Sequence, residues 1–204
     1  MAPDSSPTIY FGFGSNLWLH QMATRCPTST YLGVARLNNY KWIINDRGYA
    51  NVVEVGPKST SKSEYSYVVY GLVYSLLPSD ESRLDKNEGV PHAYMKELLA
   101  CDFWASKDGE KVDVTAFPTE SGKKMLVYID RKRMNERTPK EEYVYRMNRG
   151  IEDAVKVGVP EAYVSEVMRR FVPAERKEDK RRSHEEKAKR QAVEFVDENL
   201  ELGG

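Results

Sequence analysis

Runs of β-branched and aromatic residues dominate the middle of the chain. They predict strands at residues 31–37, 40–45, 51–55, 65–76, 93–104, 111–117 and 124–129. The run at 65–76 is apolar at both odd and even positions, which is typical of a central strand buried on both faces. Gly71 inside this run indicates a bulge or a close neighbour. The turn signal at residues 107–109 predicts a hairpin between the strands at 93–104 and 111–117.

Helical patterns occur at three places after residue 76. A typical helix start at residues 78–81 predicts a short helix that runs to about Glu88 and is stopped by Gly89. A capping box at residues 138–141, with Pro139 at the first helical position, predicts a longer helix that Gly158 ends. The apolar stripe of this helix consists of Tyr143, Met147, Ile151 and Val155. A third helix is expected from residue 160 to residue 172.

The segment Tyr10 to Leu17, YFGFGSNL, runs from a short aromatic strand into a turn flanked by glycines. Glycine permits a positive φ and close approach of the backbone, and Ser15 or Asn16 is expected to cap a helix at 17–24. Successive amides in such a turn form a nest that suits a carboxylate or a phosphate. The alternative is a tight strand-to-helix turn with no ligand. Leu17 stands where a dinucleotide fingerprint needs its third glycine, which argues against a Rossmann fold.

Composition narrows the choice of partners. With 204 residues, of which 40% are hydrophobic, the chain fits one domain with a sizeable core. The 31 basic and 31 acidic residues cancel, so no overall field attracts nucleic acid or a membrane. We identify no signal peptide or membrane span, and a cytoplasmic location is expected. The mixed-charge run at 174–191 predicts a solvated helix or tail; its basic residues, at 176–177 and 180–182, leave a nuclear-localisation or RNA-binding role as an alternative.

Metal and thiol chemistry have little support in the sequence. Cys26 and Cys101 are isolated, which argues against a zinc site and a disulfide and predicts free thiols. His20, His92 and His184 form no recognisable Cys-His signature for a catalytic cysteine.

Two carboxylates lie at the end of the predicted helix at 78–88. Glu88 is the better candidate for a base whose pKa is raised by partial burial, because it adjoins Gly89 and precedes an aromatic strand. Asp85, three residues earlier, is interpreted as a surface acid. The alternative for Glu88 is a structural role as a loop cap or an ion-pair partner.

Over residues 9–171 these features together resemble the γ-glutamylcyclotransferase family, which includes the AIG2-like proteins. The similarity lies in the order and spacing of YFGFGSNL, LDKNEGV, Tyr128, Tyr143 and the sequence at 158–160. It implies a single-domain α+β fold, with a mixed β-barrel or sheet and flanking helices. Residues 1–7 would be a disordered N-terminus, residues 8–172 the catalytic domain and residues 173–204 a charged helix or tail.

The resemblance also implies an activity, which converts a γ-glutamyl amino acid, amine or glutathione-derived conjugate to 5-oxoproline and the free amine. No metal or other cofactor is implied. Glu88 would be the catalytic acid and base. The implied substrate-binding residues are Tyr10, Phe11, Gly12, Phe13, Gly14, Ser15, Asn16, Leu17, Tyr128 and Tyr143. The partner would be a small γ-glutamyl molecule, and Tyr-rich strands are compatible with a homodimer.

Two departures from the family pattern affect these expectations. Phe13 replaces the second aromatic of the usual YGSNL motif, which removes a hydroxyl beside the turn. The spacing after Tyr143 is longer than usual, so Tyr145 competes for its role. Further candidates for the pocket wall are Arg36, Asn51 and residues 92–94. A binding or signalling module without turnover is the alternative to an enzyme.

Overall fold

The computed structural model describes residues 6–56, 63–175 and residue 190. The charged segment from residue 176 onward, and residues 1–5 of the expected disordered N-terminus, lie outside the described residues, apart from residue 190. Five strands form a closed barrel in the order β1, β5, β2, β6, β7. Their bounds are Thr8–Gly12, Val68–Leu76, Thr30–Asn38, Met95–Ala105 and Glu120–Ile129, in the same order. The expectation of a single α+β domain with a barrel is confirmed.

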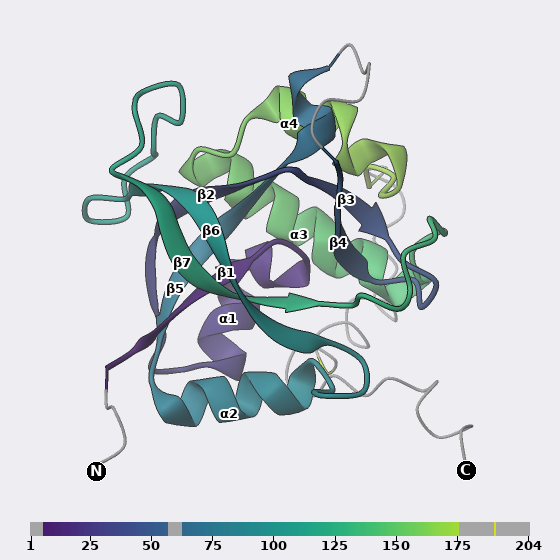
Figure 1. Cartoon of the computed structure of the whole chain (residues 1–204), viewed down its shortest axis with the longest axis horizontal. Coiled ribbons are helices and arrows are strands. Elements are labelled where there is room, and N and C mark those ends of the chain that lie inside the picture. Colours follow the sequence, from purple (N-terminus) through teal and green to yellow (C-terminus); the bar gives the residue numbers. More distant parts are fainter. Residues whose placement is uncertain (1–5, 57–62, 176–189, 191–204) are drawn as a thin grey trace.

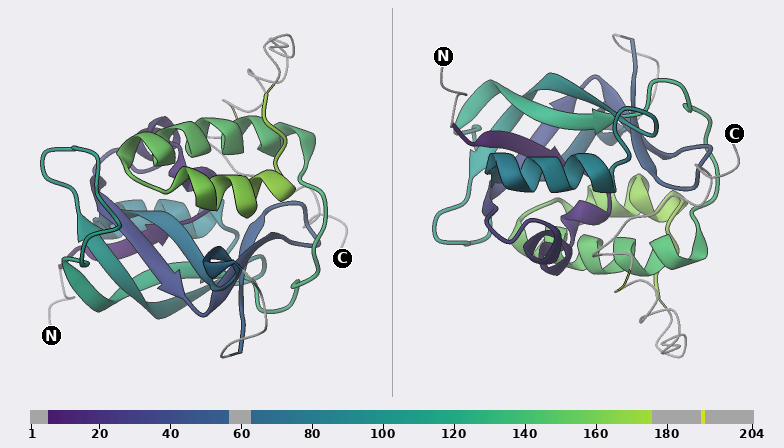
Figure 2. Two further views of the ribbon diagram at one scale, coloured as in Figure 1. Left: turned by 90° about the horizontal axis from the view of Figure 1, so that it is seen from above. Right: turned by 90° about the horizontal axis from the view of Figure 1, so that it is seen from below.

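The other elements surround this barrel (Figure 1). Strands β3 (Tyr40–Ile44) and β4 (Ala50–Glu54) form a separate hairpin. The α-helices are α1 (Leu19–Arg25), α2 (Pro78–Asn87), α3 (Glu141–Val157) and α4 (Glu161–Glu166). The 3-10 helices of the described residues are η1 (Ser15–Leu17), η2 (Glu64–Tyr67) and η3 (Met168–Arg170). Seen from above, α3 and α4 lie side by side across one face of the barrel (Figure 2), whereas α2 runs along its lower edge in Figure 1.

Strand β5 is the central strand that the sequence predicted. It pairs with β1 on one side and β2 on the other, and most of its side chains are buried. Gly71 of β5 lies directly against the backbone of β1, because a Cβ on Gly71 would lie 2.5 Å from the carbonyl oxygen of Gly12. The close neighbour expected at Gly71 is therefore β1. Residues 65–67 do not belong to the strand, since they lie in η2.

The predicted strand at 111–117 is wrong, and so is the hairpin that it implied. β6 pairs with β7 instead, with Met95 opposite Ile129 and Leu98 opposite Leu126, and a long loop joins the two strands. Within this loop the N–H of Val112 donates a hydrogen bond to the carbonyl of Val157 at 2.9 Å. The end of α3 therefore engages a segment whose alternating pattern resembles a strand.

The helix predictions differ in how well they place the ends. α2 ends at Asn87 with Glu88 as its C-cap, as expected, and Gly89 follows with φ 63°. α3 begins at Glu141 with Lys140 as N-cap and no side-chain cap, so the expected capping box is wrong. Tertiary contacts explain the later start of α3. The N–H groups of Arg137 and Lys140 donate hydrogen bonds to carbonyls of the β3–β4 hairpin, and these bonds hold the segment before Glu141 outside the helix. The stripe on α3 is confirmed, with buried side chains at 143, 147 and 151.

Candidate active site

The glycine-flanked turn after β1 forms η1, which packs against α3. α1 begins only at Leu19 with Trp18 as its N-cap, so the expected cap at Ser15 or Asn16 is wrong. Neither Gly12 nor Gly14 has a positive φ. Glycine at position 14 instead allows the Tyr143 side chain to lie close to the backbone, because a Cβ there would lie 2.8 Å from the hydroxyl of Tyr143.

Two amides of this turn, those of Ser15 and Leu17, are not available to the expected nest. The N–H of Ser15 donates to the hydroxyl of Tyr143 at 3.1 Å, and the N–H of Leu17 donates to the carbonyl of Gly14 at 3.0 Å. Both groups are occupied by contacts within the protein, so they do not converge on one anion. The Leu17 bond is the 3-10 bond of the turn, which links residues three apart, whereas the Ser15 bond reaches a side chain of α3.

Glu88 reaches the same turn from the far end of α2. Asn16 Nδ2 donates to Glu88 Oε1 at 3.1 Å and to the hydroxyl of Tyr10 at 2.8 Å. Two donors on α1 fix the orientation of the Asn16 side-chain amide, because Asn16 Oδ1 accepts hydrogen bonds from Gln21 Nε2 at 2.8 Å and from Arg25 Nη1 at 3.1 Å. Gln21 and Arg25 lie four residues apart and therefore share one face of α1.

Burial and buried cations act on Glu88 in opposite directions. Loss of hydration raises its pKa, as expected from the sequence; the positive charge of Arg25 is the largest opposing influence, followed by the hydrogen bond from Asn16. Arg25 is itself only 4% exposed, and burial together with the charge of Arg146 lowers its pKa to about 10. Burial raises the pKa of Tyr10 and Tyr143, so both hydroxyls keep their protons near neutral pH.

These groups line one cavity. Its wall is formed by Tyr10, Phe13, Gly14, Ser15, Asn16, Arg25, Tyr49, Ala50, Glu88, Tyr94, Tyr128 and Tyr143. Eight of the eleven predicted site residues are among them. The other three, Phe11, Gly12 and Leu17, do not line the cavity, and the side chains of Phe11 and Leu17 belong to the hydrophobic core.

Sequence reasoning missed Arg25, Tyr49 and Ala50, and it named Tyr94 only within the range 92–94. Arg25 ends a short helix, where a cation is common, so its type indicates no special role. Tyr49 follows the turn of the β3–β4 hairpin, and its hydroxyl donates to Glu142 at 3.1 Å. No signal in the sequence shows that this hairpin reaches the cavity.

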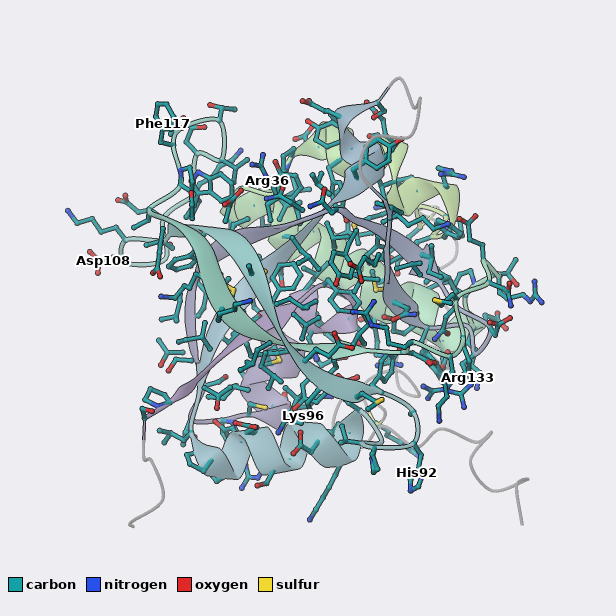
Figure 3. All side chains as sticks on the ribbon, in the orientation of Figure 1. Arg36, His92, Lys96, Asp108, Phe117 and Arg133 are labelled. Carbon is teal, nitrogen blue, oxygen red and sulfur yellow. The ribbon has the colours of Figure 1, made fainter. Side chains whose placement is uncertain are left out.

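Other candidates for the wall lie elsewhere. Arg36 pairs with Asp102 at 3.0 Å, and Figure 3 places it and His92 in different parts of the molecule, neither of them in the cavity wall. Asn51 donates to the backbone carbonyl of Asp130 at 2.8 Å and so holds the end of β7. Tyr145 packs edge-on against Trp18 and does not line the cavity, which favours Tyr143.

The structure also tests the predictions for Asp85 and for the two cysteines. Asp85 is only half-buried, but it accepts a hydrogen bond from the hydroxyl of Tyr128 at 2.6 Å, so it supports the wall rather than standing apart. Cys26 and Cys101 are free thiols, as expected, and the structure shows that both are buried. Burial raises the pKa of both thiols to about 12, which argues against a cysteine nucleophile.

A family model described as γ-glutamyl cyclotransferase, AIG2-like, matches residues 10–146. The chain belongs to this family. A bovine (Bos taurus) γ-glutamylcyclotransferase is 33% identical over 88 residues, and this match spans 43% of the chain and 47% of the relative, about half its length. A solved structure of an uncharacterized protein from Homo sapiens has a TM-score of 0.63 and 18% identity, covering 90% of this chain and 99% of that one. A solved γ-glutamyl cyclotransferase has a TM-score of 0.59 and 20% identity, with coverage of 90% and 99%. The two structures support the fold of this family member.

The described residues lack two further features. They contain no helix that is both long and apolar enough to cross a membrane. They also contain no group of three His, Cys, Asp or Glu side chains able to hold a metal ion.

Proposed function

We propose that this family member is a γ-glutamylcyclotransferase that releases 5-oxoproline from a γ-glutamyl amino acid, amine or glutathione-derived conjugate. The observation that carries the proposal is the carboxylate of Glu88, which lies in the cavity wall with a raised pKa and a hydrogen bond from Asn16. A base of this kind suits proton transfer near neutral pH.

The substrate supplies its own nucleophile in this reaction. Glu88 takes a proton from the α-ammonium group, and the freed amine nitrogen attacks the γ-carbonyl carbon to form the new C–N bond. The attacking nitrogen still carries two hydrogens after this step and must lose one more to become the lactam N–H. The protonated Glu88 returns the first proton to the nitrogen of the leaving amine as the old C–N bond breaks, and Glu88 then takes the second proton from the ring nitrogen and passes it to the amine, which leaves in its ammonium form. The products are 5-oxoproline and the free amine, with no net gain or loss of protons. The cavity contributes chiefly by folding the glutamyl chain into the cyclic shape.

Tyr10 and Tyr128 form an aromatic wall suited to the methylene chain of a glutamyl group. Their rings meet edge to face with centroids 5.6 Å apart. Phe13 extends this wall without adding a hydroxyl. The missing hydroxyl favours a second candidate function, a module that binds γ-glutamyl compounds without turnover. A cytoplasmic location and a role in glutathione metabolism belong to the same proposal.

The deciding experiment incubates the protein with γ-glutamyl amino acids, γ-glutamyl amines, glutathione and S-conjugates, and measures 5-oxoproline. Glu88→Gln preserves the shape of the side chain but removes the base, so we expect the variant to fold and its activity to fall about 1,000-fold, near the middle of the range for general acid–base catalysis. Glu161→Gln, on an exposed residue of α4, is the matched control. Turnover by the Glu88→Gln variant near that of the unmodified protein would remove Glu88 from the mechanism. Binding without 5-oxoproline release by the unmodified protein would favour the binding module.

A further inference from the structure

The hydroxyl oxygen of Ser15 accepts two hydrogen bonds from behind the cavity wall. Gln21 Nε2 donates to Ser15 Oγ at 3.0 Å, and Arg146 Nη1 donates to it at 3.2 Å. Neither donor residue lines the cavity, whereas Ser15 does. A hydroxyl has two acceptor positions and one proton, so the O–H of Ser15 must point away from both donors.

The hydroxyl of Tyr143 is constrained in the same manner. Its oxygen accepts from the N–H of Ser15 at 3.1 Å and from the N–H of Ala50 at 3.4 Å. Tyr143 also lines the cavity, and burial keeps its proton in place by raising its pKa. Among the residues that the structure describes, neither the Ser15 nor the Tyr143 hydroxyl donates to a protein acceptor.

Gln21 has a further property that supports a directing role. It is fully buried, and its Oε1 has no hydrogen-bond partner within the described part of the chain, while its Nε2 donates to both Ser15 and Asn16. An unpartnered buried acceptor destabilises the folded protein. The position of the Gln21 side chain therefore satisfies its two donated hydrogen bonds and leaves its own carbonyl oxygen without a donor in the described residues.

We propose that the hydroxyls of Ser15 and Tyr143 donate together to the α-carboxylate of the γ-glutamyl group, with Gln21 and Arg146 as positioning residues that turn the Ser15 proton toward it. This inference rests on the proposed function. It assigns the α-carboxylate two side-chain donors, one on the turn after β1 and one on α3, where the sequence predicted backbone amides.

The arrangement of charge fits an α-amino acid. The guanidinium group of Arg146, which is fully buried, bonds to Ser15 Oγ and favours negative charge beside it. Asn16, the next residue, holds the carboxylate of Glu88, which attracts an ammonium group. An α-carboxylate and an α-ammonium share one carbon atom, so adjacent sites of opposite charge suit them.

Two variants test the donors directly, with steady-state kinetics on a γ-glutamyl compound that the unmodified protein turns over. Ser15→Ala and Tyr143→Phe each remove one hydroxyl, and we expect each to raise KM about ten- to hundredfold, as for a lost hydrogen bond to a charged group. Ser165→Ala and Tyr145→Phe, outside the cavity, are the matched controls and should leave KM unchanged. With the substrate analogue that lacks the α-carboxylate, a 4-aminobutanoyl compound, neither cavity variant should differ from the unmodified protein.

The role of Gln21 has its own test. Gln21→Glu offers an acceptor where Gln21 donates, so the Ser15 proton should turn back toward it and KM should rise as in Ser15→Ala. In the Ser15→Ala background Gln21→Glu should raise KM no further, while kcat falls because Asn16 loses a donor. Gln21→Met, which adds no acceptor, should raise KM less. Thermal unfolding checks that each variant folds.

Unchanged KM in Ser15→Ala and Tyr143→Phe would overturn this inference and leave the proposed function standing. A fall in kcat alone would also overturn it, because it would place the hydroxyls at the γ-carbonyl oxygen. Failure of the unmodified protein to release 5-oxoproline from any γ-glutamyl compound would overturn the proposed function, and this inference with it.

Discussion

Asn16 and Glu88 are 72 positions apart in the sequence, yet the amide of Asn16 donates to the carboxylate of Glu88 at 3.1 Å. This bond joins the turn after β1 to the end of α2. It also makes the protonation of Glu88 depend on the orientation of one amide, which Gln21 and Arg25 determine.

Asn16→Ala should raise the pKa of Glu88, because the hydrogen bond from Asn16 lowers that pKa in the intact site. The acidic limb of the kcat/KM profile should therefore move to higher pH, and kcat should fall about tenfold or more as the carboxylate loses its orientation. The measurement is the pH profile of 5-oxoproline release. Asn135→Ala, at an exposed residue, is the control and should leave the profile in place.

Glu88→Gln should stabilise the protein at neutral pH. The raised pKa of Glu88 means that the folded state binds its proton more tightly than the unfolded state, so stability falls as pH rises from the unfolded pKa through the folded pKa. At pH values above the folded pKa, the uncharged amide of the Glu88→Gln variant avoids this loss of stability, which amounts to about 1.4 kcal/mol for each unit by which the folded pKa exceeds the unfolded pKa. Below the unfolded pKa of Glu the two proteins should differ least. Thermal unfolding at several pH values measures this difference, and equal melting temperatures throughout would contradict it.

Gly14→Ala should disturb the cavity more than the fold. The added Cβ would lie 2.8 Å from the Tyr143 hydroxyl and 3.1 Å from the Cβ of Ala50, so the tyrosine must move. We expect a loss of about 1–3 kcal/mol in the free energy of unfolding, together with a marked loss of activity. Gly56→Ala is a suitable control, because nothing lies within 4 Å of its added Cβ. Denaturant unfolding and the 5-oxoproline assay measure the two effects, and a Gly14→Ala variant that matches the control in both would refute the close contact.

Phe13→Tyr should change substrate preference rather than the chemistry. Phe13 lines the cavity and its side chain is 6% exposed, so an added hydroxyl offers a new polar contact in the wall. We expect KM values to change unequally across a panel of γ-glutamyl compounds, with the acidic limb of the pH profile unmoved. A uniform loss of activity with every compound would instead indicate a packing defect.

Several parts of the site could be predicted because they follow local rules. The end of α2 at Glu88 follows from a helix start at Pro78 and the stop at Gly89, and the buried stripe of α3 follows from helical spacing. The positions of Arg25 and Tyr49 could not be predicted, because each reaches the cavity only through the packing of α1 or of the β3–β4 hairpin. The strand predicted at residues 111–117 was wrong, because Val112 in the loop before β7 donates a hydrogen bond to the end of α3 rather than to a neighbouring strand.

The sequence by itself determined the central strand β5, the helix ends near Glu88 and Gly158, and a turn at residues 14–16 that glycine allows. These depend on periodicity and on conformational preferences, which neighbouring residues express without help from distant ones. Only the tertiary structure decided what the turn does. The amides of Ser15 and Leu17 bond within the protein. Gly14 makes room for the hydroxyl of Tyr143, and Asn16 is aligned with Glu88 by Gln21 and Arg25. Hydrogen-bond direction depends on which donors converge from other elements, and that convergence is a property of packing.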